Sequence, residues 1–466
     1  MSSSINAHSL MLQRPPLEPI ARLTQPLTGL TLSGDYQDIF QDEFINHVNR
    51  LAALLPDSQH VINLCDNRYL FLVSLCAVIV RKQTNLLPPN KNVSTQIQLG
   101  KRYENSLILH DGSTDIALDQ PNFDVSVINW SLDKTKAKLP LISNNHKAVI
   151  SFTSGSTGQS KPNIKLWRTL TSSSKINAQY MLINASVCHS HVATVPGQHM
   201  WGFETSVLLA MFANVCLVDA RPFFAHDIRS TLDKLPAPCT LISAPLHLKT
   251  FINTPMIDEQ KTITTPLASV LCATSPLDQP LASRVENRLK TTLMEVFGCS
   301  EVGSMAIRKT AKQLDWTTFS GLNFSKIGTK TSVSADHLLD TVELEDHLHF
   351  TEKGKFRLAG RSSDQIKIAG KRGSLAEVNA VLNTFEGLVD GTVFFPPQNR
   401  NVPRLVALVE LKESYSKKGL REHMALHLDA AFVPRPILVI DHLPREENGK
   451  LSKAKVLELY NERTSS

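Results

Sequence analysis

The sequence predicts an α/β protein with a large N-terminal domain and a smaller α+β domain at the C-terminus. Over the first 360 residues, short apolar segments alternate with amphipathic ones, and this order is typical of a parallel sheet flanked by helices. The pattern changes after about residue 360. The remaining residues make a module of about one hundred residues, an ordinary size for a domain. We therefore expect one domain over residues 1–360 and a second over residues 361–466.

The first strand–helix–strand unit is expected between residues 60 and 87. Residues 60–64 and 84–87 have the apolar character of short strands, and the apolar run 69–80 between them is too short to span a membrane and fits a buried helix. Such a unit implies a parallel sheet. Further strands are predicted at 106–110, 192–195, 215–218, 240–243, 269–272, 295–297, 391–395, 404–411 and 436–440, and further helices at 39–55, 172–181, 206–212, 281–293, 375–382 and 420–428.

Composition and charge argue against several classes of protein. The net charge of +6 is mild, and no dense block of Lys and Arg is present, so nucleic-acid binding has little support. The seven cysteines are scattered without a CxxC pair, which fits free thiols in a reducing compartment. The N-terminus lacks the basic-then-apolar pattern of a signal peptide. We therefore expect a cytoplasmic protein without a membrane span.

The segment Ser151–Lys161 has the composition of a polyphosphate-binding loop. After the apolar run 148–150, its residues are almost all small, hydroxylated or glycine, so backbone N–H groups can face a close ligand. Lys161 adds a positive charge. The spacing is not that of a Walker loop, and the alternating residues 163–167 predict a strand after it. A flexible Ser/Gly linker is the alternative, but linkers are not normally held between two apolar strands.

Five further motifs lie downstream of this loop in the chain. They are Pro196–Phe203 (PGQHMWGF), Val296–Gly303 (VFGCSEVG), Asp346 eight residues before Gly354, Gly360–Arg372 (GRSSDQIKIAGKR) and Leu443–Ser452 (LPREENGKLS). Together with the loop, they resemble the adenylate-forming ligase superfamily, which includes acyl- and aryl-CoA synthetases, luciferases and the adenylation domains of peptide synthetases. The resemblance covers almost the whole chain, and six motifs in this order are not expected by chance.

The resemblance implies an activity and a domain arrangement. Members of the superfamily join a carboxylate to ATP, release pyrophosphate, hold an acyl-adenylate and usually pass the acyl group to a thiol. Their large N-terminal domain consists of packed sheets, and their small C-terminal domain is a mobile lid. The expected cofactors are therefore ATP and Mg²⁺, and the expected partners are a carboxylic acid and either CoA or an acyl carrier protein.

The motifs also identify candidate site residues through this resemblance. The expected catalytic residues are Lys450, Glu301 and His199. The expected nucleotide-binding residues are Thr153, Ser154, Gly155, Ser156, Thr157, Gly158, Lys161, Ala273, Thr274, Ser275, Phe297, Gly298, Ser300, Asp346, Arg361, Gly370 and Arg372.

Each catalytic assignment has a simpler alternative. Glu301 would hold Mg²⁺, a hard cation that prefers carboxylate and phosphate oxygens, although it could be a solvated surface residue. Lys450 would meet the α-phosphate and the substrate carboxylate as negative charge develops, or it could be an exposed turn residue. Asp346 would accept hydrogen bonds from the ribose, assisted by Arg361. His199 is expected to be a gate between the acyl pocket and the thiol tunnel rather than a general base.

The resemblance further implies a rotation of the lid between two half-reactions. After adenylation the small domain would carry Lys450 away and bring the loop 370–372 to the thiol tunnel. Ser363 occupies the position of the hinge. The reaction needs no protein nucleophile, so Cys272 and Cys299 are expected to be packing or pocket-lining residues. A metal site at Cys188, His189 and His191 is not favoured, because no fourth ligand is evident.

Four departures from the superfamily pattern are visible. Pro162 stands directly after Lys161, where the superfamily usually has glycine. The Thr-Gly-Asp motif of the superfamily is replaced by Leu344-Glu345-Asp346, so only its Asp is kept. The segment between Glu301 and Asp346 is short. Met200 stands where ligases for amino acids carry Asp, which argues against an α-amino acid because a buried ammonium group needs a charged partner.

Segments 61–72, 85–90 and 368–375 are most similar to the compact ligases of bacterial aryl polyene and xanthomonadin-type pathways. There the substrate is an acid similar to hydroxybenzoate or hydroxycinnamate. A short pocket near Trp201 and Phe203 would favour such an acid. A fatty acyl-AMP or acyl-CoA ligase is one alternative, and a degenerate, non-catalytic adenylation-fold protein is the other.

Overall fold

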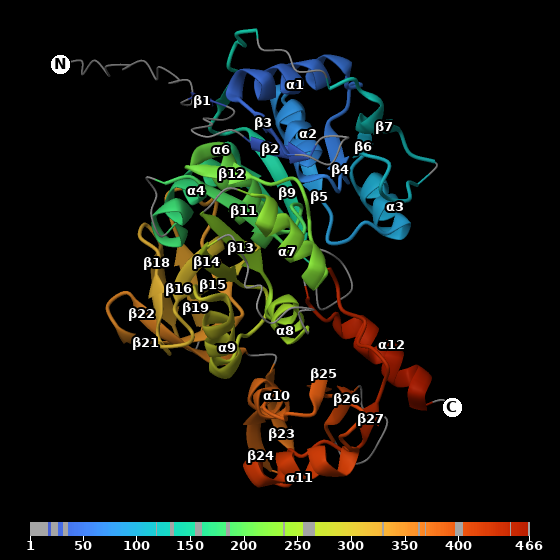
Figure 1. The fold of residues 1–466 in the computed structure, drawn as a ribbon, viewed down its shortest axis with the longest axis vertical. Helices are drawn as coiled ribbons and strands as arrows, with labels where there is room; N and C mark the ends of the chain where they lie inside the picture. The colour runs from blue at the N-terminus through green and yellow to red at the C-terminus, as the bar shows by residue number, and fades with distance from the viewer. Residues whose placement is uncertain are drawn as a thin grey trace, which may run out of the picture.

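Two large sheets form the N-terminal part of the molecule, and a smaller unit lies below them in Figure 1. The fold is known from a computed structural model. It describes residues 17–19, 27–30, 36–117, 119–130, 135–153, 161–182, 187–235, 238–254, 266–328, 330–361, 364–368, 370–396, 404–447 and 449–464. None of the helices in these ranges is long and apolar enough to cross a membrane.

The first sheet has the strand order β10-β9-β5-β4-β6-β7 and contains the predicted βαβ unit. Strands β4, β5, β6, β7 and β9 run parallel, and β10 is antiparallel to β9. Helix α2 is buried on nearly every side, as the uniformly apolar run predicts. The elements are α1 (Gln41–Leu54), β4 (His60–Asn63), α2 (Arg68–Val80), β5 (Thr84–Leu87), α3 (Val93–Arg102), β6 (Ser106–His110), β7 (Asn122–Asp124), η1 (Val125–Val127), β9 (Lys147–Thr153) and β10 (Lys161–Leu166).

The second sheet has the order β12-β11-β13-β14-β15-β16-β17-β22-β21. Its first five strands are parallel and the remaining ones antiparallel. Its strands are β11 (His189–Ala193), β12 (Val215–Leu217), β13 (Cys239–Ser243), β14 (Leu267–Cys272), β15 (Thr292–Cys299), β16 (Gly303–Arg308), β17 (Trp316–Thr318), β21 (Asp346–Glu352) and β22 (Lys355–Arg361). The accompanying helices are α4 (Trp167–Met181), α5 (Met200–Gly202), the π-helix η2 (Phe203–Leu208), α6 (Leu209–Phe212), α7 (Ala225–Lys234), α8 (Pro245–Asn253) and α9 (Gln279–Leu289).

Small sheets complete the N-terminal part, and a separate set of elements begins after residue 361. Two of the small sheets pair β1 (Leu17–Pro19) with β8 (Leu141–Ser143) and β2 (Leu27–Leu30) with β3 (Tyr36–Ile39). The third has the order β18 (Asn323–Ile327), β19 (Lys330–Ser334), β20 (Val342–Leu344). The C-terminal elements are β23 (Gln365–Ile368), β24 (Lys371–Ser374), α10 (Leu375–Asn383), β25 (Leu388–Phe394), β26 (Val406–Leu411), α11 (Lys417–His427), β27 (Ile437–Val439) and α12 (Lys453–Thr464).

The predicted α/β class is confirmed, and most predicted elements are present within a few residues of their expected bounds. The helix predicted at 281–293 is wrong at its C-terminal end. Helix α9 ends at Leu289 because Lys290 adopts a left-handed conformation (φ 52°), and β15 begins at Thr292. The helix predicted at 172–181 begins earlier, at Trp167, and that predicted at 206–212 continues a π-helix.

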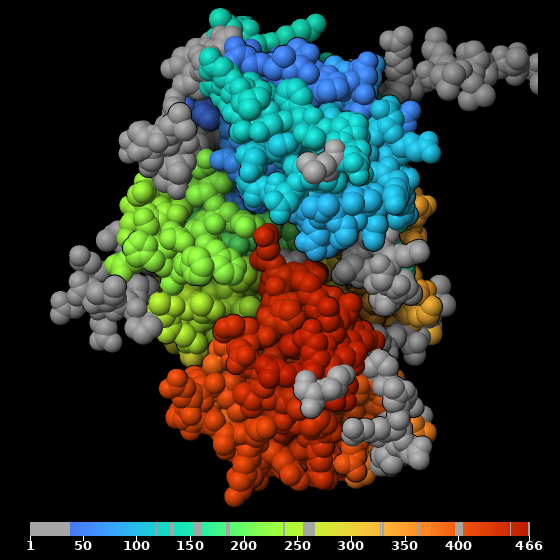
Figure 2. Space-filling model, turned by 90° about the vertical axis from the view of Figure 1, so that its right-hand side faces the viewer, coloured from blue at the N-terminus to red at the C-terminus, as the bar shows by residue number. Residues whose placement is uncertain are grey.

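The C-terminal unit contacts the N-terminal part through helix α8 and the segment that follows β12. Lys249 of α8 donates from Nζ to the carbonyl oxygens of Leu388 (3.2 Å) and Val389 (2.7 Å). Arg221 forms an ion pair with Glu447 (2.6 Å). In Figure 2 the red C-terminal segment reaches up to the green and cyan parts of the chain. These contacts place the segment 445–451 beside the second sheet.

Candidate active site

The candidate site lies at the carboxyl ends of the parallel strands in the second sheet. Strands β11, β13, β14 and β15 run in the same direction, so the segments that come after them emerge at one edge. Ser243 pairs with Cys272, and Cys272 with Glu295, which brings these ends into register. The motif segments 196–203, 273–275 and 298–301 begin at this edge. Loops at such an edge are the usual place for ligand binding in α/β sheets.

The predicted phosphate-binding loop joins two paired strands, as the sequence indicated. Thr153 at the end of β9 lies directly opposite Lys161 at the start of β10, and the Lys161 side chain is exposed. Ser154, Gly155, Ser156, Thr157 and Gly158 lie outside the described residues, as does the side chain of Thr153. Ser151 Oγ and Asn163 Nδ2, from another opposed pair of this hairpin, are buried without a hydrogen-bond partner among the described residues.

Glu301 lies in a tight turn between β15 and β16. The pairs Gly298–Ser304 and Cys299–Gly303 close this turn, and Ser300 and Glu301 within it are half-buried. Two glycines make it possible. A Cβ on Gly298 would lie 2.5 Å from the Gly303 carbonyl oxygen, and Gly303 has a φ of +100°, which other residues rarely adopt. These two glycines therefore determine the path of the turn that presents Glu301.

The segment Ala273–Ser275 comes directly after β14. Thr274 has a φ of +85°, an unusual conformation for a β-branched residue. Ala273 is buried and Thr274 and Ser275 are half-buried. The Phe297 ring packs against Trp316 and Phe356, with centroids 5.7 Å and 5.6 Å away. Phe297 can therefore meet a ligand mainly through its backbone.

Asp346 and Arg361 are brought together by the antiparallel pairing of β21 and β22. Arg361 donates from Nε to Asp346 Oδ1 (2.9 Å) and from Nη2 to Oδ2 (3.3 Å), a two-pronged contact. The Asp346 side chain is 16% exposed and that of Arg361 is 52% exposed. The pair is accessible at one side, and its remaining oxygen lone pairs can accept further hydrogen bonds.

Lys450 is held in a short loop that docks against the N-terminal part. Arg445 anchors the loop, because it forms an ion pair with Asp390 (2.6 Å) and donates to the Gly449 carbonyl oxygen (2.9 Å). Gly449 (φ +79°) lies next to Ala244 at the end of β13. The Lys450 side chain keeps access to solvent, but the protein atoms crowded around its ammonium group and the charge of Arg361 lower its pKa. Glu301 acts in the opposite direction.

His199 lies close enough to Lys450 to sense its charge. Burial and, to a smaller extent, the positive charge of Lys450 lower the pKa of His199 to about 3. Its Nδ1 atom is buried without a hydrogen-bond partner among the described residues. The imidazole is therefore neutral near pH 7 and is a weak base. Lys450, Glu301, Arg361 and His199, from four separate segments of the sequence, are thus close enough for their charges to interact around Lys450.

Comparison with known families gives a clear match. Residues 44–334, more than half of the chain, match the family model described as AMP-binding enzyme. The chain belongs to the AMP-binding enzyme family.

Several relatives of this AMP-binding enzyme are known. A 3,4-dihydroxybenzoate–[aryl-carrier protein] ligase from Bacillus anthracis is 22% identical over 325 residues, which cover 67% of this chain and 74% of the ligase. Tyrocidine synthase 2 from Brevibacillus parabrevis is 29% identical over 132 residues, which cover 28% of this chain and only 4% of that synthase.

Solved structures share the fold of the AMP-binding enzyme over nearly its whole length. ATP-bound MatB from Rhodopseudomonas palustris has a TM-score of 0.77 at 15% identity and covers 95% of this chain and 97% of its own. Apo MatB from the same organism has a TM-score of 0.64. The o-succinylbenzoate CoA synthetase MenE from Bacillus subtilis, in complex with its acyl-adenylate intermediate, has a TM-score of 0.76 at 15% identity, with coverages of 95% and 98%. At these identities the likeness establishes the fold alone.

Two expected residues, Gly370 and Arg372, lie on a hairpin of the C-terminal unit of the AMP-binding enzyme. Gly370 (φ +80°) and Arg372 belong to the β23–β24 hairpin, which lies near α11 in the lower part of Figure 1. Lys371 between them forms an ion pair with Asp429 of the same C-terminal unit (2.5 Å). The side chain of Arg372 and the hinge candidate Ser363 lie outside the described residues.

Phe203, near which a short pocket would favour an aromatic acid, is a core residue. Its ring is fully buried and packs edge-on against Phe71 at a centroid distance of 6.4 Å. Trp201 is 6% exposed and donates from Nε1 to the Ser243 carbonyl oxygen (3.1 Å). His189 and His191 are also core residues, bonded to Thr240 Oγ1 (3.1 Å) and the Thr205 carbonyl oxygen (2.8 Å).

Two charged residues beside the Glu301 turn were not found from the sequence. Lys165 is 2% exposed and donates from Nζ to the Glu301 carbonyl oxygen (2.5 Å). Glu204 is 3% exposed and accepts hydrogen bonds from Ser304. The alternation of polar and apolar residues around Lys165 predicts a strand. In such a strand the apolar residues are expected to face the core and the polar residues to face solvent, which would place Lys165 at the surface. No signal in a single sequence marks a charged residue that faces inward.

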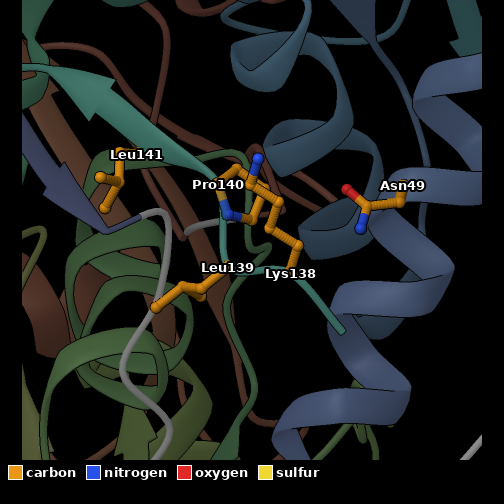
Figure 3. Close-up of a pocket in the computed structure, with 5 residues that line it drawn as sticks. All are labelled: Asn49, Lys138, Leu139, Pro140 and Leu141. Carbon is orange, nitrogen blue, oxygen red and sulfur yellow. The ribbon is translucent and has the colours of Figure 1, made fainter. Parts of the chain in front are cut away.

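A surface hollow of about 470 Å³ lies elsewhere on the AMP-binding enzyme (Figure 3). It is lined by Asn49 of α1 and by residues 138–141, which precede or begin β8. None of the motif residues contributes to it. The hollow therefore has no part in the site described above.

Proposed function

We propose that this protein is an ATP-dependent ligase that activates a carboxylic acid and transfers it to a thiol. In the first half-reaction a carboxylate oxygen attacks the α-phosphorus of ATP, the bond to pyrophosphate breaks, and an acyl-adenylate forms. In the second, a thiolate attacks the acyl carbonyl carbon and AMP leaves. The observation that carries the proposal is that the charges of Glu301 and Arg361 both act on Lys450, while Arg361 is paired with Asp346.

The donor set fits ATP and Mg²⁺. Glu301 offers a half-buried carboxylate, a hard ligand suited to Mg²⁺, and the buried unpartnered Ser151 Oγ indicates a polar environment near the hairpin. When bound, Mg²⁺ would offset phosphate charge. We propose that Asp346 and Arg361 hold the ribose and that the backbone of 273–275 and 297–298 flanks the adenine. Residues proposed to hold the phosphates are Thr153, Ser154, Gly155, Ser156, Thr157, Gly158, Lys161 and Ser300.

Lys450 is the proposed catalytic cation of the first half-reaction. Its ammonium group would stabilise the negative charge that develops on the α-phosphate and the attacking carboxylate. We propose His199 as a neutral gate beside it, since a base with a pKa of about 3 holds no proton near pH 7. We propose that the present arrangement of the C-terminal unit, in which Gly449 lies next to Ala244, is the one that serves the first half-reaction.

The second half-reaction would require the C-terminal unit to turn. We propose residues 1–360 as the adenylation domain and 361–466 as the lid, with Ser363 at the hinge. Two observations support this. The apolar core of the C-terminal unit is separate from the cores of the large sheets, and the fold resembles ATP-bound MatB more closely than apo MatB. Rotation would withdraw Lys450 and bring the hairpin of Gly370 and Arg372 to the thiol.

We propose an aromatic acid, similar to hydroxybenzoate or hydroxycinnamate, as the substrate. Support comes from the dihydroxybenzoate ligase of B. anthracis and from the structural likeness to MenE. Met200, which is 9% exposed, offers no charge to an α-ammonium group. The thiol acceptor would be CoA or an acyl carrier protein, and an aryl polyene or xanthomonadin-type pathway is the proposed context.

Acid-dependent exchange of label between pyrophosphate and ATP tests the proposal. Benzoates, cinnamates, fatty acids and amino acids are offered in turn. We expect exchange with hydroxybenzoates or hydroxycinnamates. Exchange only with long-chain acids would replace the aryl proposal by a fatty acyl ligase. No exchange with any acid would leave the non-catalytic alternative.

A further inference from the structure

Lys165 lies on the inner face of strand β10. Pairing with β9 is regular from Lys161 to Lys165, so Ile164 and Lys165 point to opposite faces of the hairpin. As a result Ile164 is 39% exposed while Lys165 is 2% exposed. The Lys165 ammonium group donates to the main-chain oxygen of Glu301 at 2.5 Å. One end of the Glu301 turn is therefore held by a buried positive charge.

Glu204 holds the other end of the same turn. It lies at the start of the π-helix η2, a rare element that is frequent at functional sites. Its Oε2 accepts hydrogen bonds from Ser304 N (3.0 Å) and Ser304 Oγ (2.7 Å). Its Oε1 is so close to Gly303 that a Cβ there would lie 2.3 Å away. The carboxylate thus fits directly against the backbone on the C-terminal side of Glu301.

The two buried charges compensate each other. Burial lowers the pKa of Lys165, and the negative charge of Glu204 opposes this more strongly than that of Glu301. Burial likewise raises the pKa of Glu204, while the Ser304 hydroxyl and the charge of Lys165 oppose the rise. Buried ions contribute little to stability compared with apolar residues of similar size. Their placement at both ends of one turn indicates that they fix geometry.

We propose that Lys165 and Glu204 are positioning residues that fix the turn 299–304 and hold the Glu301 carboxylate where Mg²⁺ and the nucleotide bind. This inference rests on the proposed role of Glu301. Neither residue touches the reacting atoms. Partners of this kind orient a metal ligand without binding the metal, and their loss typically lowers metal affinity by about 10- to 100-fold.

The test compares Lys165→Met, Glu204→Gln and the double variant with the unaltered protein. The first measurement is the Mg²⁺ concentration that gives half-maximal pyrophosphate exchange. The second needs no turnover and is the rise in Tm on adding ATP with Mg²⁺, compared with ATP and EDTA. We expect each single variant to need about tenfold more Mg²⁺ and to lose most of the Mg²⁺-dependent rise in Tm.

The double variant separates positioning from stability. Removing one buried charge leaves the other without its counter-charge, so each single variant should unfold at a lower temperature. The double variant should regain part of that loss but should keep the raised Mg²⁺ requirement. If its Mg²⁺ requirement returns to that of the unaltered protein, the positioning role is wrong.

Glu295→Gln is the matched control. Glu295 is buried at the far end of the same β15–β16 hairpin and pairs there with Arg308 (2.8 Å). Its substitution should lower Tm without changing the Mg²⁺ requirement. Two results would show that Lys165 and Glu204 have a merely structural role. One is an equally raised Mg²⁺ requirement in Glu295→Gln, and the other is a lower Tm with an unchanged Mg²⁺ requirement in Lys165→Met and Glu204→Gln.

The positioning role can still be tested if a variant does not fold or if the unaltered protein shows no exchange. If a single variant does not fold, Ser304→Ala removes only the hydroxyl donor to Glu204 and should raise the Mg²⁺ requirement about fivefold. An unchanged Mg²⁺ requirement in Ser304→Ala would then overturn the proposal. If the unaltered protein shows no exchange with any acid, the proposed function fails, and the Tm measurement with Mg²⁺ and ATP still decides the positioning role.

Discussion

Replacing Arg445 by Met should weaken adenylation far more than thioester formation. Arg445 donates from Nε and Nη2 to Asp390 (2.6 Å and 2.7 Å) and from Nη1 to the Gly449 carbonyl oxygen (2.9 Å). The two side chains are 21% and 14% exposed, so the pair is shielded from water. Hydrogen bonds to charged groups contribute about 1.5–3 kcal/mol. We expect a cost of about 2 kcal/mol for holding the Lys450 loop in place.

That cost sets an upper bound on the loss of rate. Since about 1.4 kcal/mol corresponds to a factor of ten, the exchange of pyrophosphate into ATP should slow by up to about 30-fold. Transfer of the acyl group from a supplied acyl-adenylate to a thiol should change little, because Lys450 is proposed to act only in the first half-reaction. The two rates are measured separately on the same preparation.

The control is Arg463→Met in the same C-terminal unit. Arg463 contacts Asp441 at 3.5 Å, and both side chains are well exposed, so the expected effect is below about 0.5 kcal/mol. An equal loss in both half-reactions of Arg445→Met, or no loss in either, would refute the argument that Arg445 acts by holding Lys450 in the adenylating position.

Three further predictions concern single residues. Lys450→Ala should abolish pyrophosphate exchange and spare acyl transfer from a supplied adenylate, and equal loss of both would contradict the turning lid. Asp346→Asn should raise the KM for ATP by at least about tenfold, measured by exchange at saturating acid, while an unchanged KM would exclude Asp346 from the ribose site. Burial lowers the pKa of His191 to about 4 in the folded protein, whereas an unfolded histidine has a pKa of about 6.5. Between these two values the unfolded chain binds a proton that the folded protein does not, so stability falls as the pH falls from about 6.5 towards about 4. The free energy of unfolding should drop by about 2 kcal/mol between pH 7 and pH 5 on account of this residue, and urea titrations of His191→Gln at both pH values should show that much less pH dependence.

The sequence predicted those parts of the structure that local pattern controls. The loop after the apolar run 148–150 does join two paired strands, and the segments after β14 and β15 do emerge at one edge. The two glycines of the 296–303 motif explain why it was recognisable, because the turn tolerates no side chain at Gly298 and needs a positive φ at Gly303. Motifs of this kind can be recognised in a sequence because the backbone conformation requires glycine at particular positions.

The parts that the sequence did not predict depend on contacts between distant segments. Lys165 is buried because its face of β10 packs against the Glu301 turn, and Glu204 is buried because η2 packs against the turn after β15. Phe203 packs on Phe71, more than one hundred residues earlier in the chain, and nothing in its local sequence indicates that contact. Helix α9 stops at Leu289 because Lys290 takes a left-handed conformation that no local pattern announced.

The most direct test of the central claim is a single-turnover reaction without thiol. The protein is mixed with ATP, Mg²⁺ and a hydroxybenzoate, quenched, and examined by mass spectrometry for the aryl-adenylate. We predict about one equivalent of aryl-adenylate per protein together with pyrophosphate, and release of AMP with thioester formation once CoA or an acyl carrier protein is added. Formation of ADP and phosphate, or the absence of any acyl-adenylate across the panel of acids, would contradict the account.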